Sequence, residues 1–249
     1  MIIFLLLIVL LLLGVLLYRS LHAEQRLQHL ESRLQQGIRD EVGGLFNQLE
    51  SYHYLRDRLN LQQGMPYTRD WSAAPDFLKL IVEHCLEHKP RTIVECSSGL
   101  TTVMLARCCE MNGGGEVSSL ENGAEFATKT RKHLARYRLQ TYASVIDAPL
   151  QTYTLNATPY EWYAIDELPD HSIEMLVIDG PPGFIQRHSR YPALPLLFNK
   201  LADGCVIFMD DAARDDEKAI VAMWQAEFTA VEHRFIHTER GCSLLRVER

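Results

Sequence analysis

The 249-residue sequence lacks the patterns that identify several common kinds of ligand site. It has six cysteines but no CxxC pair, so a zinc site built from paired thiolates is not indicated. Its net charge is −7 and no stripe of lysine and arginine offsets it, which disfavours a nucleic-acid partner held through phosphates. No GxGxxG follows the first predicted strand, so a nicotinamide oxidoreductase ranks last among the enzyme classes considered. We expect the cysteines to be buried reduced thiols rather than disulfides or metal ligands.

No lysine or arginine occurs in the first seventeen residues, Met1–Leu17, which form an apolar run. At about 1.5 Å per helical residue the run falls within the range of membrane-spanning helices. A cleavable signal peptide would start with basic residues and end at a small-x-small site, and the LHA triplet after the run is a poor match. We therefore expect residues 1–18 to be an uncleaved single-pass anchor. The positive-inside rule predicts that the remainder faces the cytoplasm, because the run is followed by Arg19, Arg26 and Arg33.

Residues 19–63 predict an amphipathic or coiled-coil stalk. Apolar side chains recur mostly at steps of three and four among polar residues, at Leu27, Leu30, Leu34, Ile38, Val42, Leu45, Leu49, Tyr52 and Leu59. Gly37, Gly43 and Gly44 weaken the helix by about 1 kcal/mol each relative to alanine. Two alternatives follow: a homodimer formed through residues 20–60, or a helix that packs on its own domain.

Residues 64–249 alternate between strand and helix patterns after a boundary at Gly64-Met65-Pro66. The predicted strands are Thr92–Cys96, Glu116–Glu121, Tyr142–Asp147, Ile173–Asp179, Cys205–Asp210, Val231–His237 and Cys242–Val247. The predicted helices are Ala74–Glu87, Thr101–Met111, Ala124–Arg138, Tyr191–Leu201 and Asp215–Phe228. This alternation predicts an α/β fold: a Rossmann-like, doubly wound, mostly parallel seven-stranded sheet that ends in an antiparallel hairpin.

The stretch RTIVECSSGLTT, Arg91–Thr102, organises this domain. A short buried strand ends on Glu95, and two serines and Gly99 lead into a helix. Such a turn lets the backbone approach a nucleotide-like ligand and presents unpaired N–H groups. The acid at the strand end would repel a pyrophosphate but suits a ligand with positive charge and hydroxyls. The pattern therefore favours S-adenosylmethionine (SAM) over NAD or ATP.

From about Trp71 to Arg249 the sequence resembles the class I SAM-dependent methyltransferases. The motifs that carry the resemblance are Glu95-Cys96-Ser97-Ser98-Gly99, Glu121, Asp147-Ala148 and Asp179-Gly180-Pro181-Pro182-Gly183. The resemblance implies that Glu95, Ser97 and Gly99 hold the methionine part of SAM, that Glu121 accepts the ribose hydroxyls and that Asp147 and Ala148 lie beside adenine. It also implies that Asp179 faces the methyl group. Ser97 stands where the family usually has glycine, and it would be strained in a glycine-only conformation.

Three carboxylates, Asp179, Asp210 and Asp211, follow two neighbouring strands and form a predicted metal site. Uncompensated they would repel one another, so either a cation joins them or some of them cap helices. An all-oxygen set suits Mg²⁺, Mn²⁺ or Ca²⁺ rather than zinc. The pattern resembles the catechol-type metal-dependent O-methyltransferases, in which the metal holds two adjacent substrate oxygens and lowers the hydroxyl pKa.

One departure from the catechol-type pattern concerns the general base, because Pro182 stands where those enzymes carry a lysine. The nearest polar substitutes are His188 and Arg187, and the intrinsic pKa of histidine suits base catalysis. The loop Gly183–Arg190 reads as a substrate lid. Its basic side chains, Arg187 and Arg190, favour an acidic or phosphorylated acceptor, such as a uronic sugar or a lipid-linked glycan.

The favoured hypothesis is a membrane-anchored, cytoplasm-facing methyltransferase that acts on a hydroxyl of a small molecule or glycan, with divalent-cation assistance. A metal-independent methyltransferase of the same fold is the first alternative. The second is a non-catalytic membrane-anchored scaffold with a degenerate SAM pocket.

Overall fold

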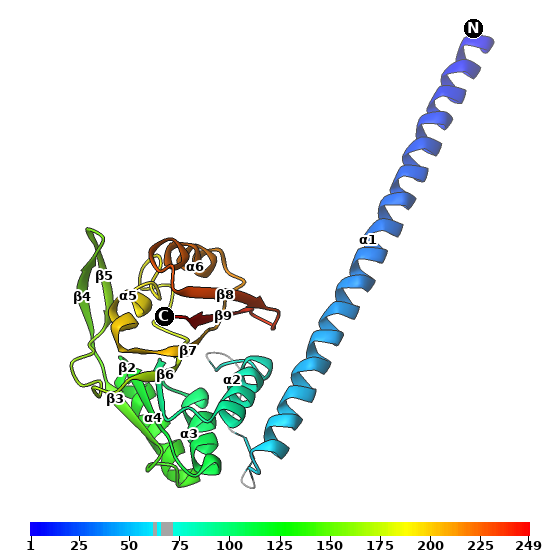
Figure 1. Cartoon of the computed structure of the whole chain (residues 1–249). Coiled ribbons are helices and arrows are strands. Elements are labelled where there is room, and N and C mark those ends of the chain that lie inside the picture. Colours follow the sequence, from blue (N-terminus) through cyan, green and yellow to red (C-terminus); the bar gives the residue numbers. More distant parts are fainter. Residues whose placement is uncertain (62–63, 66–71) are drawn as a thin grey trace. The chain divides into compact units, whose positions relative to one another are not determined.

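The computed structural model describes residues 1–61, 64–65 and 72–249 and divides the chain into two compact units, Met1–Asn47 and Gln48–Arg249 (Figure 1). Helix α1 (Ile2–Arg58) makes up nearly all of the first unit and continues into the second. The predicted anchor, residues 1–18, and most of the predicted stalk, residues 19–63, therefore belong to one continuous helix. The expected boundary at Gly64-Met65-Pro66 adjoins residues 62–63 and 66–71, which lie outside the described part, and it stays a prediction.

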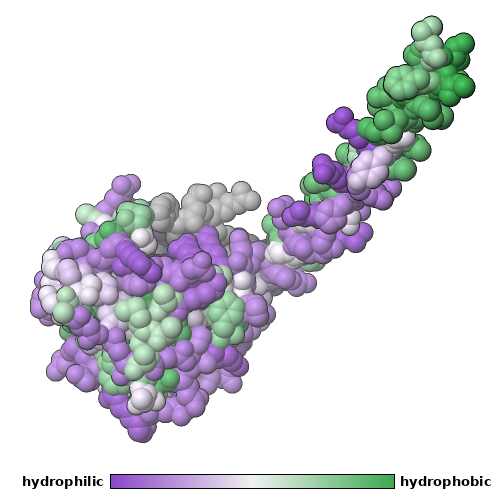
Figure 2. Space-filling model, turned by 90° about the horizontal axis from the view of Figure 1, so that it is seen from above, coloured by the Kyte–Doolittle hydropathy of each residue, from purple (hydrophilic) through white to green (hydrophobic). Residues whose placement is uncertain are grey.

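The apolar beginning of α1 forms a continuous hydrophobic surface, and the segment after it is mainly hydrophilic (Figure 2). Within the described residues, α1 is the one helix that is long and apolar enough to cross a membrane. The apolar stripe of the stalk is exposed along the first unit, at Leu27, Leu30, Leu34, Ile38, Val42 and Leu45. Association of two copies through residues 20–60 stays a prediction.

The second unit contains a seven-stranded sheet with the order β3-β2-β1-β6-β7-β9-β8. Its strands are β1 (Thr92–Cys96), β2 (Glu116–Glu121), β3 (Ala143–Asp147), β6 (Ile173–Ile178), β7 (Leu201–Met209), β8 (Val231–Ile236) and β9 (Cys242–Val247). Strand β9 runs antiparallel to β7 and β8, and the other neighbouring pairs are parallel. The predicted doubly wound sheet with a terminal hairpin is thus confirmed. The carboxyl ends of the five parallel strands share one edge, which gathers their end residues.

Helices cover both faces of this sheet (Figure 1). One face packs against α2 (Pro75–His88), α3 (Leu100–Asn112) and α4 (Ala124–Tyr137). The other packs against α5 (Ala193–Leu197), the 3₁₀ turn Phe198–Lys200 and α6 (Asp215–Glu227). Successive residues of each central strand point into opposite cores, so these strands are apolar on both sides, as parallel strands between helix layers must be. The six cysteines are free and buried, as predicted.

One predicted helix is shorter than expected. The sequence analysis assigned Tyr191–Leu201 to a helix, but α5 covers only Ala193–Leu197 and β7 already begins at Leu201. Pro192 caps the start of α5 and lacks an N–H, and the residues after Leu197 form the 3₁₀ turn Phe198–Lys200 instead of a further α-helical turn.

A two-stranded hairpin was missed. Strands β4 (Leu150–Leu155) and β5 (Thr158–Tyr163) pair antiparallel outside the main sheet. Asn156 and Ala157 connect them with φ of +49° and +62°, which is the backbone of a type I′ turn. That turn usually carries Asn-Gly, and alanine at the second position hides the signal in the sequence.

Candidate active site

Glu95 is the next-to-last residue of β1 and is completely enclosed. Its Oε2 accepts hydrogen bonds from the hydroxyls of Thr102, at 2.5 Å, and Ser119, at 2.8 Å. Its Oε1 is buried without a hydrogen-bond partner among the described residues. Burial raises the pKa of Glu95 to about 7, against the opposing effect of the nearby hydroxyl groups of Thr101, Thr102 and Ser119. The acid beneath the turn therefore keeps one unused acceptor atom.

The turn after β1 has the conformation that the sequence analysis flagged as strained for serine. Ser97 adopts φ of +88°, and its backbone N–H donates to the Leu120 carbonyl at 2.9 Å. The chain after β6 packs closely on this turn, since a Cβ built on Gly180 would lie 2.7 Å from the Ser97 Cβ. A non-glycine residue in such a region costs about 1–3 kcal/mol. Gly99 is different: its φ of 170° is ordinary, and a Cβ there would meet nothing within 4 Å, so the turn leaves open space at the start of α3.

Replacing Ser97 by glycine should stabilise the protein. We expect the unfolding free energy to rise by about 1 kcal/mol and the melting temperature by about 2–4 °C, because relief of strain outweighs the added freedom of the unfolded chain. Thermal unfolding followed by circular dichroism measures the effect. The matched control is Ser144→Gly on β3, where serine has an ordinary strand conformation and glycine should be destabilising. A melting temperature for Ser97→Gly at or below that of the wild type would contradict the strain.

The ends of β2 and β3 supply the other predicted cofactor residues. Glu121 is buried; its Oε2 accepts from the backbone and hydroxyl of Ser98, at 2.9 and 3.0 Å, and its Oε1 accepts from the Gly123 N–H at 2.8 Å. Asp147 is largely exposed and pairs with the Arg131 guanidinium at 2.8 Å. Ala148 is buried, and its N–H donates to the Glu121 carbonyl at 2.8 Å. The hydrogen bonds of Glu121 thus join the turn after β1 to the ends of β2 and β3.

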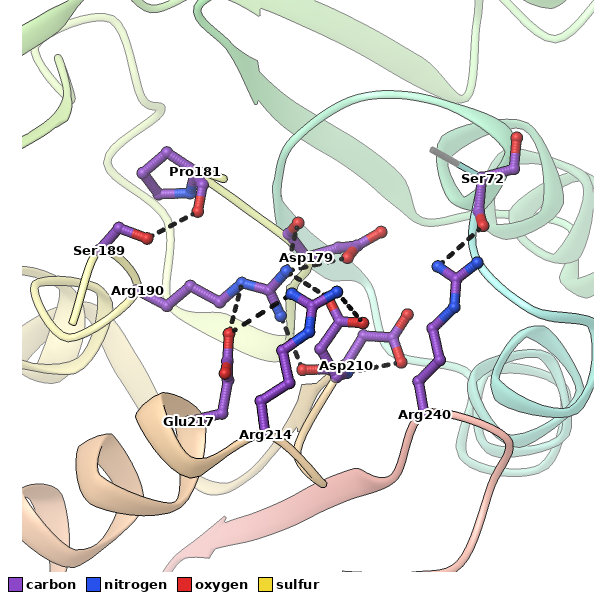
Figure 3. Close-up of polar contacts among 10 residues, drawn as sticks. Ser72, Asp179, Pro181, Ser189, Arg190, Asp210, Arg214, Glu217 and Arg240 are labelled. Carbon is purple, nitrogen blue, oxygen red and sulfur yellow. Dashed lines mark hydrogen bonds and ion pairs between the residues drawn. The ribbon is translucent and has the colours of Figure 1, made fainter. Parts of the chain in front are cut away.

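Across the edge, one guanidinium gathers the acids that follow β6 and β7 (Figure 3). Arg190 has only 3% of its side chain exposed. Its Nη2 lies 2.7 Å from Asp211 Oδ2 and 3.4 Å from Asp179 Oδ1, and its Nη1 donates to the Asp210 carbonyl at 2.7 Å. Its Nε lies 3.9 Å from Glu217 Oε1, on α6. The charge of Arg190 is therefore shared among buried acids of three elements.

Asp179, Asp210 and Asp211 differ in their exposure and in their hydrogen-bond partners. Burial raises the pKa of Asp210, and the neighbouring carboxylates of Asp179 and Asp211 add to the rise. Asp210 Oδ1 accepts the Asp211 N–H at 2.8 Å, and its Oδ2 is buried without a partner among the described residues. Burial also raises the pKa of Asp179, against the attraction of Arg190, and 18% of the Asp179 side chain is exposed. A second guanidinium, of Arg214, reaches Asp211 Oδ1 at 2.9 Å.

Comparison with known proteins decides the class of this domain. Residues 94–212 match the model of a family described as "Methyltransferase domain". This part of the chain is a methyltransferase domain. The match covers the second part of β1, the following turn, β2, β3, β6, β7 and all the predicted site residues, so the site lies within the domain. The sequence matches no curated protein.

Solved structures similar to this chain show that its fold is that of known methyltransferases. An O-methyltransferase from Bacillus cereus in complex with SAH is 16% identical, with a TM-score of 0.56 over 80% of this chain and 91% of the other. The SAH-bound methyltransferase PaMTH1 of Podospora anserina is 12% identical, with a TM-score of 0.57 over 81% and 88%. The O-methyltransferase TomG of Streptomyces achromogenes, involved in tomaymycin synthesis and in complex with SAM, is 15% identical, with a TM-score of 0.54 over 81% and 90%.

The cofactor side of the methyltransferase domain fits SAM chemically. SAM carries an ammonium group, a sulfonium and ribose hydroxyls, and the site offers carboxylates at Glu95, Glu121 and Asp147. The unused Oε1 of Glu95 and the open space at Gly99 are the two features that a cationic ligand at this turn would use. The predicted cofactor-binding residues all lie at this edge of the sheet.

The metal side of the domain does not fit a divalent cation as it stands. Arg190 nitrogens contact the carboxylates of Asp179 and Asp211 and the main-chain carbonyl of Asp210. Within residues 1–61, 64–65 and 72–249, no three His, Cys, Asp or Glu side chains are arranged to hold one metal ion. A divalent cation would need the Asp179 and Asp211 oxygens, and here these two carboxylates already face the Arg190 guanidinium. The predicted metal site at these three residues is therefore replaced by a buried ion-pair cluster.

The loop after β6 also differs from its prediction. His188 has φ of +55°; its N–H donates to Asp216 Oδ2 at 2.7 Å and its Nε2 lies 3.6 Å from Asp216 Oδ1. The structure therefore pairs His188 with the start of α6, whereas it is Arg190 that contacts Asp179. Arg187 is exposed, but Arg190 is buried and its charge is not available to an acidic substrate. The excess of acids at the strand ends was the sequence signal for a buried cation, and the loop arginine supplies it.

Proposed function

We propose that this protein is a SAM-dependent O-methyltransferase held at a membrane by residues 1–18. The observation that carries the proposal is the buried, unpartnered Oε1 of Glu95 beneath the turn at Ser97 in a methyltransferase domain. A buried carboxylate oxygen without a donor is costly, and the ammonium group of SAM would satisfy it. The similar solved structures include O-methyltransferases in complex with SAH or SAM, which supports this choice.

Each predicted cofactor residue is assigned to one part of SAM. Glu95, Ser97 and Gly99 would hold the methionine part, Glu121 would accept the ribose hydroxyls, and Asp147 with Ala148 would flank adenine. SAM itself supplies an electrophilic methyl group on a positively charged sulfur.

Asp179 would act as the base for the acceptor hydroxyl. It lies at the end of β6, and its N–H donates to the Cys96 carbonyl at 3.1 Å, beside the cofactor turn. Burial raises the pKa of its carboxyl, which makes it a better proton acceptor at neutral pH, and part of the side chain remains open. We propose a small molecule or a glycan as the acceptor. The charge of the Gly183–Arg190 loop gives little support to an acidic one, since Arg190 is engaged with protein acids.

Calorimetric titration of SAM into the detergent-solubilised full chain tests the proposal. We expect micromolar binding, and methyl transfer to a hydroxylated acceptor found by screening. A folded protein that binds no SAM up to millimolar concentration would overturn the enzymatic function, and a non-catalytic membrane-anchored scaffold would be the better account. Activity that disappears with EDTA and returns with Mg²⁺ would restore the divalent-cation hypothesis.

Membrane attachment through α1 gives a separate prediction. Deletion of residues 2–18 should move the protein from the carbonate-resistant membrane fraction to the soluble fraction, because it removes nearly all of the apolar surface of the predicted anchor. We propose that the methyltransferase domain faces the cytoplasm, supported by the basic residues after the anchor and the free cysteines. Glutamate at all three of Arg19, Arg26 and Arg33 is the control: this variant should stay in membranes but lose uniform orientation in protease-protection assays. If carbonate treatment released the full-length chain from the membrane fraction, the prediction of a membrane anchor would be wrong.

A further inference from the structure

The cluster at the ends of β6 and β7 contains more acids than a methyltransferase site needs for proton transfer. Asp179, Asp210, Asp211 and Glu217 all lie there, and each is buried or nearly so. Carboxylates this close cannot all ionise unless a cation accompanies them. In this chain the accompanying cation is covalently part of the protein.

We propose that the guanidinium of Arg190 takes the place of a divalent cation in this domain. It contacts the same kinds of oxygen from the same two strand ends that a metal ion would use. Its Nη2 lies 2.7 Å from a carboxylate oxygen of Asp211 and 3.4 Å from one of Asp179, and it also donates to the Asp179 carbonyl at 3.1 Å. Its Nη1 donates to the Asp210 carbonyl at 2.7 Å. One planar group thus ties the end of β6 to the end of β7.

The neighbours of Arg190 hold it in this position. Ser189, the residue before Arg190, is held by the hydrogen bond that its hydroxyl donates to the Pro181 carbonyl at 3.0 Å (Figure 3). The Tyr191 carbonyl accepts from the indole N–H of the buried Trp224 at 2.9 Å, which fixes the residue after it. A guanidinium remains charged throughout the physiological pH range, and moving it out would leave several buried carboxylates unpaired. The positive charge at this point is therefore permanent and independent of cation concentration.

The consequence for catalysis rests on the proposed function. The guanidinium of Arg190 is taken up by the carboxylates of Asp179 and Asp211 and by two main-chain carbonyls, so it is a positioning residue and does not touch the acceptor. It holds the Asp179 carboxylate at the open side of the cluster and attracts its negative charge. Methyl transfer by this domain would then need no added divalent cation, and Asp179 would bind the acceptor hydroxyl directly.

The experiment removes the Arg190 guanidinium from the full-length protein and asks whether a free cation can replace it. Thermal unfolding in detergent is measured for the wild type and for Arg190→Ala, each with EDTA and with titrations of MnCl₂, MgCl₂ or guanidinium chloride at low millimolar concentration. For the wild type we expect the melting temperature to be the same with EDTA and with Mn²⁺. For Arg190→Ala we expect a melting temperature lower by roughly 5–15 °C, because buried carboxylates lose their partner. Mn²⁺ or guanidinium should then restore about 3–6 °C in a saturable way.

Controls separate this effect from general changes in stability. Arg187→Ala removes an exposed arginine of the same loop and should respond to no cation. Arg190→Lys keeps a charge and should respond less than Arg190→Ala. A wild type that EDTA destabilises, or a folded Arg190→Ala variant that no cation stabilises, would overturn the proposal. If Arg190→Ala does not fold, the wild-type EDTA and Mn²⁺ titrations and the Arg190→Lys variant decide. Unfolding requires no SAM, so failure of the proposed methyltransferase function would appear separately, in the SAM titration.

Discussion

The Glu95→Gln variant should bind SAM about 10- to 100-fold more weakly than the wild type at pH 8. Hydrogen bonds to charged groups contribute about 1.5–3 kcal/mol, and the substitution removes the charge while leaving the size and shape of the side chain. The oxygen that accepts from Thr102 and Ser119 is retained, so the turn should stay folded. Calorimetric titration of both proteins measures the difference. The control is Glu116→Gln, an exposed acid at the start of β2 on the opposite edge of the sheet, which should bind SAM as the wild type does.

The Glu95→Gln variant should also change how the free energy of unfolding and the affinity for SAM depend on pH. Burial raises the pKa of Glu95 from 4.5 to about 7, so the folded protein holds a proton that the unfolded chain releases above pH 4.5. The contribution of this group to stability is therefore fully present below about pH 4.5 and is lost as the pH rises to 7, a decrease of about 3 kcal/mol. In Glu95→Gln this decrease should be absent. SAM binding to the wild type should strengthen through pH 7 with proton release, because the ammonium group favours the ionised acid; a pH-independent wild-type affinity would contradict the role.

The Asp179→Asn variant should lose about 10²- to 10⁴-fold in kcat while its affinity for SAM changes by less than about threefold. Asparagine keeps the shape of the side chain but cannot accept a proton, and base catalysis is typically worth that factor. Single-turnover methyl transfer to a screened acceptor, with SAM binding measured in parallel, separates the two effects. Asp215→Asn, a fully exposed acid at the start of α6, is the matched control and should leave kcat unchanged. An Asp179→Asn variant that transfers methyl groups at the wild-type rate would show that another group takes the proton.

Local patterns were sufficient to predict most of the fold. The sequence analysis placed the five parallel strands and the terminal hairpin near their observed bounds, because apolar runs between helical patterns are characteristic of strands in a doubly wound sheet. The predicted strand Cys205–Asp210 overlaps β7, Leu201–Met209, which starts four residues earlier and ends one residue earlier. The hairpin of β4 and β5 was missed because alanine stands at the second position of its turn, Asn156-Ala157, where a type I′ turn usually has glycine. Its stability depends on aromatic packing against α5 and the sheet, which no short window of sequence contains.

The site residues also separate into those that the sequence could place and those that needed the structure. Glu95, Glu121, Asp147 and Asp179 could be assigned to one edge because the ends of parallel strands always meet there. The sequence showed that Ser97 would be strained if the turn had a conformation that favours glycine. Only the structure showed that it does: Ser97 has a positive φ, and Gly180 packs closely against it.

The sequence by itself determined the alternation of strands and helices, the apolar N-terminal helix and the convergence of acids at one edge of the sheet, since each follows from spacing along the chain. Only the tertiary structure decided what neutralises those acids. Arg190 is eleven residues from Asp179 and twenty from Asp210, and its exposure, partners and charge balance depend on how the loop after β6 folds back onto α6. A pattern of residues can show that a cation is needed, but whether that cation is a metal ion or a side chain is a matter of which group reaches the buried oxygens.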